Sequence, residues 1–189
     1  AVQRGAAPAD VLLLGAAGSG VDVATQNLWN TATRMRCAGL PEADAALALE
    51  QQRSFFDLLG GRIDASQHDA TTARATARPA LRDWLFPDSR SIDATGAPWY
   101  SVLQLDFDPL PVWRTYSGRA WLLLAEHDDS TPSAAVRTRI QGTPATVLWL
   151  DGTQHLGLRA ASVCAGELRD VAGFDPRVFQ YVRAFASAR

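Results

Sequence analysis

The sequence predicts an α/β protein built on a parallel β-sheet of about three strands, with a long helical insertion. Three observations support this fold class. Three short apolar segments have the character of buried strands, a helix-length segment separates the last two, and about ninety mostly helical residues separate the first two. A strand, a helix and a second strand in succession pair their strands in parallel.

The three predicted strands are Val11–Gly15, Ala120–Ala125 and Ala145–Leu150. Each is short, apolar and bounded by turn residues, which is typical of a strand that is covered on both faces. Between the second and the third lies Ser133–Gln141, a predicted helix that ends at Gly142. These elements form the strand–helix–strand unit of the core.

A last helix is predicted after Asp175 and Pro176, because these residues make a good N-cap and first-turn pair. Val178, Val182 and Phe185 follow at helical spacing. We expect this apolar stripe to pack on the sheet.

The residues between the first two strands form the predicted insertion. It covers residues 21–112 and separates two core segments, 1–20 and 113–189. We expect a cap or lid, because a segment this long between two strands of one sheet is usually functional. A separate helical domain is the alternative.

Three helices are predicted inside the insertion. The first covers Asp22–Ala38, and the second begins at Pro41 and ends at Gly60. The third covers roughly Ala70–Phe86, where Pro79 should kink or split it, because proline lacks the N–H that a helix interior needs.

Composition limits the classes of function. The 189 residues are 47% hydrophobic and 20% charged with a net charge of −2, which is ordinary for a soluble globular protein and lacks the basic excess that nucleic-acid binding needs. No apolar run approaches the roughly 20 residues that cross a bilayer, so no membrane partner is expected. Every basic residue is arginine, which excludes chemistry that needs a lysine amine. The chain begins at Ala1 without methionine, and we expect a processed, trimmed or partial sequence.

The chain contains two cysteines, Cys37 and Cys164. They are too few for a disulfide framework or a structural zinc site, so no metal is predicted. We expect both to be buried free thiols.

Two predicted strands end in loops whose residues can move or steer protons. Asp128 lies three residues past the second strand and His155 five residues past the third. Ligands bind at the carboxyl ends of parallel strands, and neighbouring strands lie about 4.8 Å apart, so the two side chains should meet. An aspartate bonded to one imidazole nitrogen leaves the other free to take a proton from a nucleophile. In the alternative, Asp128 only caps the following helix and His155 is inert.

Five segments occur in a distinctive order along most of the chain: VLLLGAAGSGV, RCAGLPEADAALALEQQRSFFDLL, PWYSVLQLDFDPLPVWRTYSGRAWLLLAEHDDSTP, GTQHLGL and GELRDVAGFDPRVFQYVRAF. In this order they resemble the α/β-hydrolases, in particular bacterial serine hydrolases related to dienelactone hydrolase and prolyl oligopeptidase. The chain order of that family is nucleophile, acid, histidine. The resemblance implies a sheet of the α/β-hydrolase type with a helical cap, Asp128 as the acid, His155 as the general base, no cofactor, and an ester or similar acyl substrate.

The family's nucleophile motif, G-x-S-x-G, does not occur in this sequence. Ser19 in GAAGSGV is the nearest candidate, but Ala17 and Val21 occupy the flanking glycine positions of the strained elbow, and we reject it. The resemblance places the nucleophile, and with it part of the oxyanion hole, upstream of Ala1. We expect the missing amino-terminal half to be a partner, covalent or as a second chain, because an unpaired apolar strand edge invites association. This chain alone should be inactive.

Two other functions stay open. A non-catalytic hydrolase remnant or partner-binding subunit would also lack the nucleophile. The segment VLLLGAAGSGVDVATQNL resembles the nucleotide-binding turn of medium-chain reductases, whose glycines let backbone amides approach a pyrophosphate. An NADP-binding fold then needs a second strand with a ribose-binding acid about 20 residues on, whereas residues 36–60 are predicted to be helical.

Overall fold

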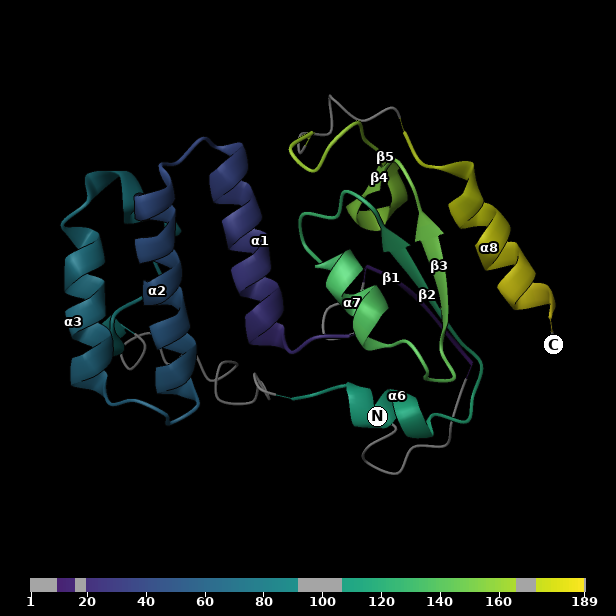
Figure 1. The fold of residues 1–189 in the computed structure, drawn as a ribbon, viewed down its shortest axis with the longest axis horizontal. Coiled ribbons are helices and arrows are strands. Elements are labelled where there is room, and N and C mark those ends of the chain that lie inside the picture. Colours follow the sequence, from purple (N-terminus) through teal and green to yellow (C-terminus); the bar gives the residue numbers. More distant parts are fainter. Residues whose placement is uncertain (1–9, 16–19, 92–106, 166–172, 189) are drawn as a thin grey trace. The chain divides into compact units, whose positions relative to one another are not determined.

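The computed structural model describes residues 10–15, 20–91, 107–165 and 173–188. The chain divides into two compact units (Figure 1). The core unit joins Ala1–Asp22 to Asp108–Arg189, and the helical unit is Val23–Phe107.

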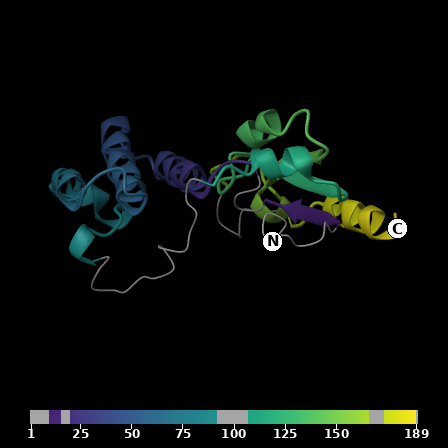
Figure 2. The same cartoon turned by 90° about the horizontal axis from the view of Figure 1, so that it is seen from below.

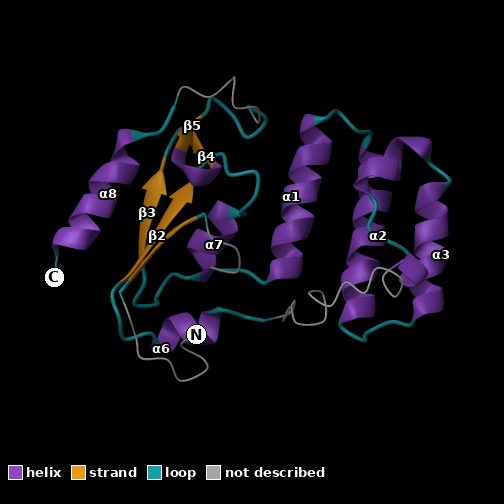
Figure 3. Ribbon diagram, turned by 180° about the vertical axis from the view of Figure 1, so that it is seen from behind, coloured by secondary structure: helices purple, strands orange, loops and turns teal. Residues whose placement is uncertain are grey.

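The core unit contains a three-stranded parallel sheet in the order β1–β2–β3, labelled in Figure 1. Strands are drawn in orange in Figure 3. Strand β1 covers Val11–Leu14, β2 covers Ala120–Ala125 and β3 covers Thr146–Leu150. The predicted α/β class and the parallel pairing are therefore confirmed, and each strand lies within one residue of its expected bounds.

Three helices cover the two faces of this sheet. Helix α6 (Leu110–Thr115) and helix α7 (Ser133–Arg139) lie on one face, and α8 (Pro176–Ser187) lies on the other (Figure 2). The core unit therefore has three layers, with the sheet in the middle. This arrangement explains why β2 is apolar at every position, since both of its faces are covered.

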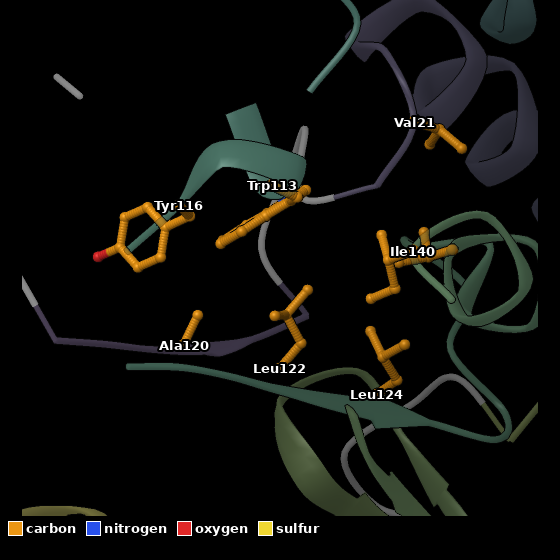
Figure 4. Close-up of a cluster of buried hydrophobic side chains, with 8 residues drawn as sticks. Val21, Trp113, Tyr116, Ala120, Leu122, Leu124 and Ile140 are labelled. Carbon is orange, nitrogen blue, oxygen red and sulfur yellow. The ribbon is translucent and has the colours of Figure 1, made fainter. Parts of the chain in front are cut away.

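Successive residues of β2 point to opposite faces of the sheet, as the pleat of a strand requires. Leu122 and Leu124 pack with Trp113 of α6 in the cluster drawn in Figure 4. Leu123, between them in sequence, packs with Val178 of α8 in a second cluster. All five side chains are at most 8% exposed. The sheet is thus the common wall of two apolar clusters.

Arg119 connects the start of β1 to the end of α8. Its backbone N–H and its Nη2 donate to the carboxylate of Asp10 at 3.0 and 3.1 Å. Its Nη1 donates to the carbonyl of Ala188 at 2.9 Å, and its guanidinium lies 4.1 Å from the ring centroid of Phe185. The two ends of the described core unit therefore meet at one side chain.

Helix α8 begins as predicted, with Asp175 as a side-chain N-cap. The predicted stripe is only partly right. Val178 is buried and Phe185 contacts a β2 tryptophan, but Val182 is 44% exposed. Tyr181 takes the sheet-facing position expected of Val182. The residues of α8 that face the sheet are therefore Val178, Tyr181 and Phe185, at positions i, i+3 and i+7.

The helical unit contains α1 (Val23–Cys37), α2 (Glu42–Leu59), α3 (Ala65–Thr76) and a 3-10 helix, Pro79–Trp84. Its aromatic centre comprises Phe55, Phe56 and Phe86, whose rings meet edge to face. Within the described ranges, none of the helices combines the length and the apolar character that crossing a bilayer requires.

The split of the third predicted helix at Pro79 is confirmed, because α3 ends at Thr76 and the 3-10 helix begins at the proline. The predicted start at residue 70 is five residues late. Asp64 and Gln67 form a capping box, in which each side chain accepts the backbone N–H of the other, and the helix begins at Ala65.

The core unit resumes at Asp108, ahead of the predicted boundary after residue 112. The reason is α6, which carries Trp113 into the apolar cluster on the sheet. An ion pair of 2.7 Å between Asp108 and Arg139 of α7 also joins this segment to the core.

Both cysteines differ from expectation. Cys37 and Cys164 are disulfide-bonded, and both are exposed. The prediction of buried free thiols is therefore wrong. Cys37 is the last residue of α1 and Cys164 lies in a turn, and neither position is enclosed by an apolar cluster.

Candidate active site

Asp128 and His155 lie in the loops that follow β2 and β3. Asp128 is in the connection from β2 to α7. His155 begins a short 3-10 turn, His155–Gly157, between the antiparallel strands β4 (Thr153–Gln154) and β5 (Leu158–Arg159). The small hairpin thus presents the histidine at its tip, beside the neighbouring loop.

Hydrogen bonds hold the two loops in register. The backbone N–H of Glu126 donates to the carbonyl of Leu150 at 3.1 Å, and that of His127 to the carbonyl of Thr153 at 2.7 Å. The Glu126 carboxylate in turn accepts the N–H of Gly152 at 2.8 Å. Glu126 therefore has a structural role, because it joins the acid loop to the turn that leads to the histidine.

The side chains of Asp128 and His155 meet, as the strand order predicts. Nδ1 of the imidazole lies 3.0 Å from Oδ1 and 3.2 Å from Oδ2 of the carboxylate. The carboxylate is fully buried, whereas the imidazole remains 28% exposed. A buried acid therefore supports a histidine whose outer side can reach solvent or a ligand.

Two further hydrogen bonds fix the carboxylate. Oδ1 of Asp128 accepts the backbone N–H groups of Ser130 at 2.8 Å and Thr131 at 2.7 Å. Helix α7 begins only at Ser133 and has no side-chain cap. Asp128 therefore stabilises its own loop and does not cap the helix, so the capping alternative is wrong.

The carboxylate also sets the charge behaviour of the imidazole. The hydrogen bond that His155 donates to Asp128 raises the pKa of His155 above 6.5, its ordinary value. Burial opposes this effect, and the charges of Asp128 and Asp129 add to it. A carboxylate can only accept, so Nδ1 carries the proton toward it. Nε2 makes no hydrogen bond within the described residues and is available to a reactant.

The turn that holds His155 is strained. Leu156 has φ of 64°, in the left-handed region, and is the non-glycine residue with positive φ in the described chain. Gly157 also has positive φ, and a Cβ on it would lie 2.5 Å from Cγ2 of Val178. Helix α8 therefore packs directly against this turn. Strain held by surrounding packing is characteristic of functional positions.

A second histidine contact, in the helical unit, has a different character. Nδ1 of His68 lies 2.9 Å from Oγ of Ser54, and Nε2 lies 2.9 Å from the carbonyl of Pro87. The serine hydroxyl also lies 2.7 Å from the carbonyl of Gln51. His68 is fully buried and both ring nitrogens are occupied, so this serine and histidine form a structural contact.

The remaining histidine, His127, lies beside Asp128 in sequence but outside the pair. Its Nε2 is 3.7 Å from the Glu126 carboxylate. Ser19, the rejected nucleophile candidate, lies outside the described residues.

Two residues near the pair were missed by sequence reasoning. Gly15 follows β1 and lies against the ring of His155. Thr131 is buried, and its hydroxyl donates to the carbonyl of Gly15 at 3.1 Å. The only sequence signal for them is their place: one ends a strand and the other ends the acid loop.

Comparison with known proteins finds no matching family model, no curated relative and no similar solved structure. Over the part of the chain that is described, no group of three or more metal-binding side chains is present. The segment in which a dinucleotide-binding fold would need its second strand is occupied by α2. The Asp128–His155 pair is therefore the feature of the described residues that points to a chemical function.

Proposed function

We propose that this chain is the acid-and-base part of a serine-type α/β-hydrolase that acts on esters or related acyl compounds. The observation that carries the proposal is the buried Asp128 carboxylate bonded to Nδ1 of His155, at the carboxyl ends of adjacent parallel strands. The order of the pair along the chain, acid before histidine, is that of the α/β-hydrolases.

The pair suits one chemical task. Nε2 of His155 accepts the proton of a serine hydroxyl as the serine oxygen attacks the acyl carbonyl, and the Asp128 carboxylate stabilises the resulting imidazolium. The imidazolium then gives that proton to the departing alkoxide, which leaves an acyl-enzyme. A water molecule repeats the two transfers, releasing the acid and restoring the serine. The raised pKa of His155 is consistent with a stabilised imidazolium.

The proposal places the serine in sequence upstream of Ala1, with the missing part of the sheet beside β1. Among the described strands, β1 pairs only with β2. All four of its residues are apolar and partly exposed, whereas five of the six residues of β2 are buried. An apolar strand with one open edge is a favourable place for another strand to pair.

Fluorophosphonate labelling of the intact gene product tests the activity. We expect an adduct on an upstream serine, and its loss in His155→Ala, because the hydroxyl would no longer have a base. His127→Ala is the matched control, since that histidine is on the same loop system but outside the pair, and it should label normally.

Each other result has a definite meaning. Absence of any adduct in the wild-type protein would favour the non-catalytic, partner-binding alternative. An adduct on Ser19 would contradict an upstream nucleophile. Equal labelling of His155→Ala and wild type would contradict the role of the base.

The missing half is tested separately, with the 189-residue chain alone. We expect this chain to self-associate or to unfold without cooperativity, because no described strand pairs with the outer edge of β1. Gel filtration and urea denaturation measure both properties. A monomer that unfolds in a single cooperative transition would contradict this part of the proposal, while leaving the labelling experiment unaffected.

A further inference from the structure

Gly15 lies against the Asp128–His155 pair. It follows the last residue of β1 and has φ of 54°. A Cβ atom at this position would lie 2.8 Å from both Cε1 and Nδ1 of the imidazole and 3.3 Å from Oδ2 of the carboxylate. Real Cβ atoms essentially never approach other atoms to less than 3.0 Å. The imidazole therefore occupies space that any side chain at position 15 would take.

The position of Gly15 is fixed from two sides. Its N–H donates to the carbonyl of Leu123 in β2 at 3.3 Å. Its carbonyl accepts the hydroxyl of Thr131 at 3.1 Å, and the N–H of Thr131 donates to Asp128 at 2.7 Å. One buried threonine thus links the end of β1 to the carboxylate. This link fixes the distance between the backbone of Gly15 and the Asp128 carboxylate.

Positive φ alone does not explain why position 15 is a glycine. Gly142, in the turn after α7, also has positive φ, of 77°, but a Cβ on it would have no atom within 4 Å. At Gly142 the backbone alone requires glycine. At Gly15 the backbone and the imidazole both require it.

We propose that Gly15 is a positioning residue for His155: its missing side chain leaves the space in which the imidazole meets the Asp128 carboxylate, and the Thr131 hydroxyl keeps that space constant. The importance of this for catalysis rests on the proposed hydrolase function, but the geometry can be tested without it. A methyl group at position 15 displaces the ring, since the ring is the outer part of a side chain and the neighbouring backbone belongs to the sheet.

The readout is the pKa of His155, measured by NMR titration of the intact gene product with labelled histidine, with the resonance assigned through His155→Gln. In the wild type we expect a pKa above 6.5, and in Gly15→Ala a fall toward that value, because the bond to Asp128 is the largest cause of the rise. Gly142→Ala is the matched control. This variant also places a methyl group on a residue with positive φ, but the methyl group does not contact the imidazole. The pKa of His155 should therefore not change.

Thr131 provides a second, milder pair of variants. Thr131→Val removes the hydroxyl and should lower the pKa of His155, whereas Thr131→Ser keeps the hydroxyl and should restore it. If ester hydrolysis is found, kcat should fall by about 100-fold in Gly15→Ala, as expected for a misplaced base, and remain normal in Gly142→Ala.

An unchanged His155 pKa in a folded Gly15→Ala protein would overturn the proposal. If that variant does not fold, the threonine pair decides: equal pKa values in Thr131→Val and Thr131→Ser would overturn it, and a fall only in Thr131→Val would support it. A normal pKa response in a protein that hydrolyses no ester would leave the positioning role intact and contradict the proposed function.

Discussion

The two histidine contacts of this protein, His155 in the core unit and His68 in the helical unit, use the same side chain in opposite ways. His155 has one nitrogen bonded to a buried carboxylate and no described hydrogen-bond partner for the other. His68 has a serine hydroxyl at one nitrogen and a carbonyl at the other, and is fully buried.

The difference separates the histidine on which the proposed function rests from a histidine with a structural role. A serine next to a histidine is the most familiar sign of a hydrolase. Ser54 and His68, however, are both buried, and both nitrogens of His68 have hydrogen-bond partners. The carboxylate, the exposed side of the ring and the position at the strand ends all belong to His155. The orienting acid and the free nitrogen are thus more informative than proximity to serine.

The largest effect expected is on catalysis, from Asp128→Asn in the intact protein. The asparagine oxygen can still accept the N–H groups of Ser130 and Thr131, so the loop should keep its shape. The imidazole loses the charge that stabilises its protonated form, and kcat should fall by about 10⁴-fold. Steady-state ester hydrolysis measures this. The matched comparison is Ser54→Ala, which should leave kcat within about threefold; an equal loss in both variants would remove the distinction between the two histidines.

The next effect is on stability, from His68→Ala. Removal of the ring leaves a cavity and unpaired groups at Ser54 and Pro87, and the free energy of unfolding should fall by about 2–4 kcal/mol. His155→Ala, by contrast, removes a partly exposed ring and should cost less than His68→Ala. Urea denaturation of the intact protein gives both values. A larger loss for His155→Ala would contradict the structural assignment of His68.

The smallest effect concerns pH. The pKa of His155 is raised in the folded protein, so the folded state binds this proton more tightly than the unfolded state. The resulting stability is fully present below pH 6.5, the ordinary pKa, and is lost as pH rises through the folded-state pKa. Asp128→Asn should remove this pH dependence, which denaturation curves measured on both sides of neutral pH would show; a slope of equal size in the variant would assign it to another group.

Much of the core could be predicted because its signals are local. The three strands are short apolar runs, and the split at Pro79 follows from the chemistry of proline. The meeting of Asp128 and His155 could also be predicted, since consecutive parallel strands bring their carboxyl ends together.

The errors arise where sequence patterns are degenerate or contacts are distant. Val182 and Tyr181 are adjacent and both apolar, so spacing alone could not decide which faces the sheet. The contact of Thr131 with Gly15 joins residues 116 positions apart, and glycine gives no periodic signal. The capping box at Asp64 was present in the sequence and gives the true start of α3.

The guanidinium of Arg119 couples the first and the last residues that the structure describes. Because it bonds to both Asp10 and Ala188, these two residues are neighbours in space although they lie at opposite ends of the described chain. Loss of this guanidinium would therefore release the start of β1 and the end of α8 at the same time.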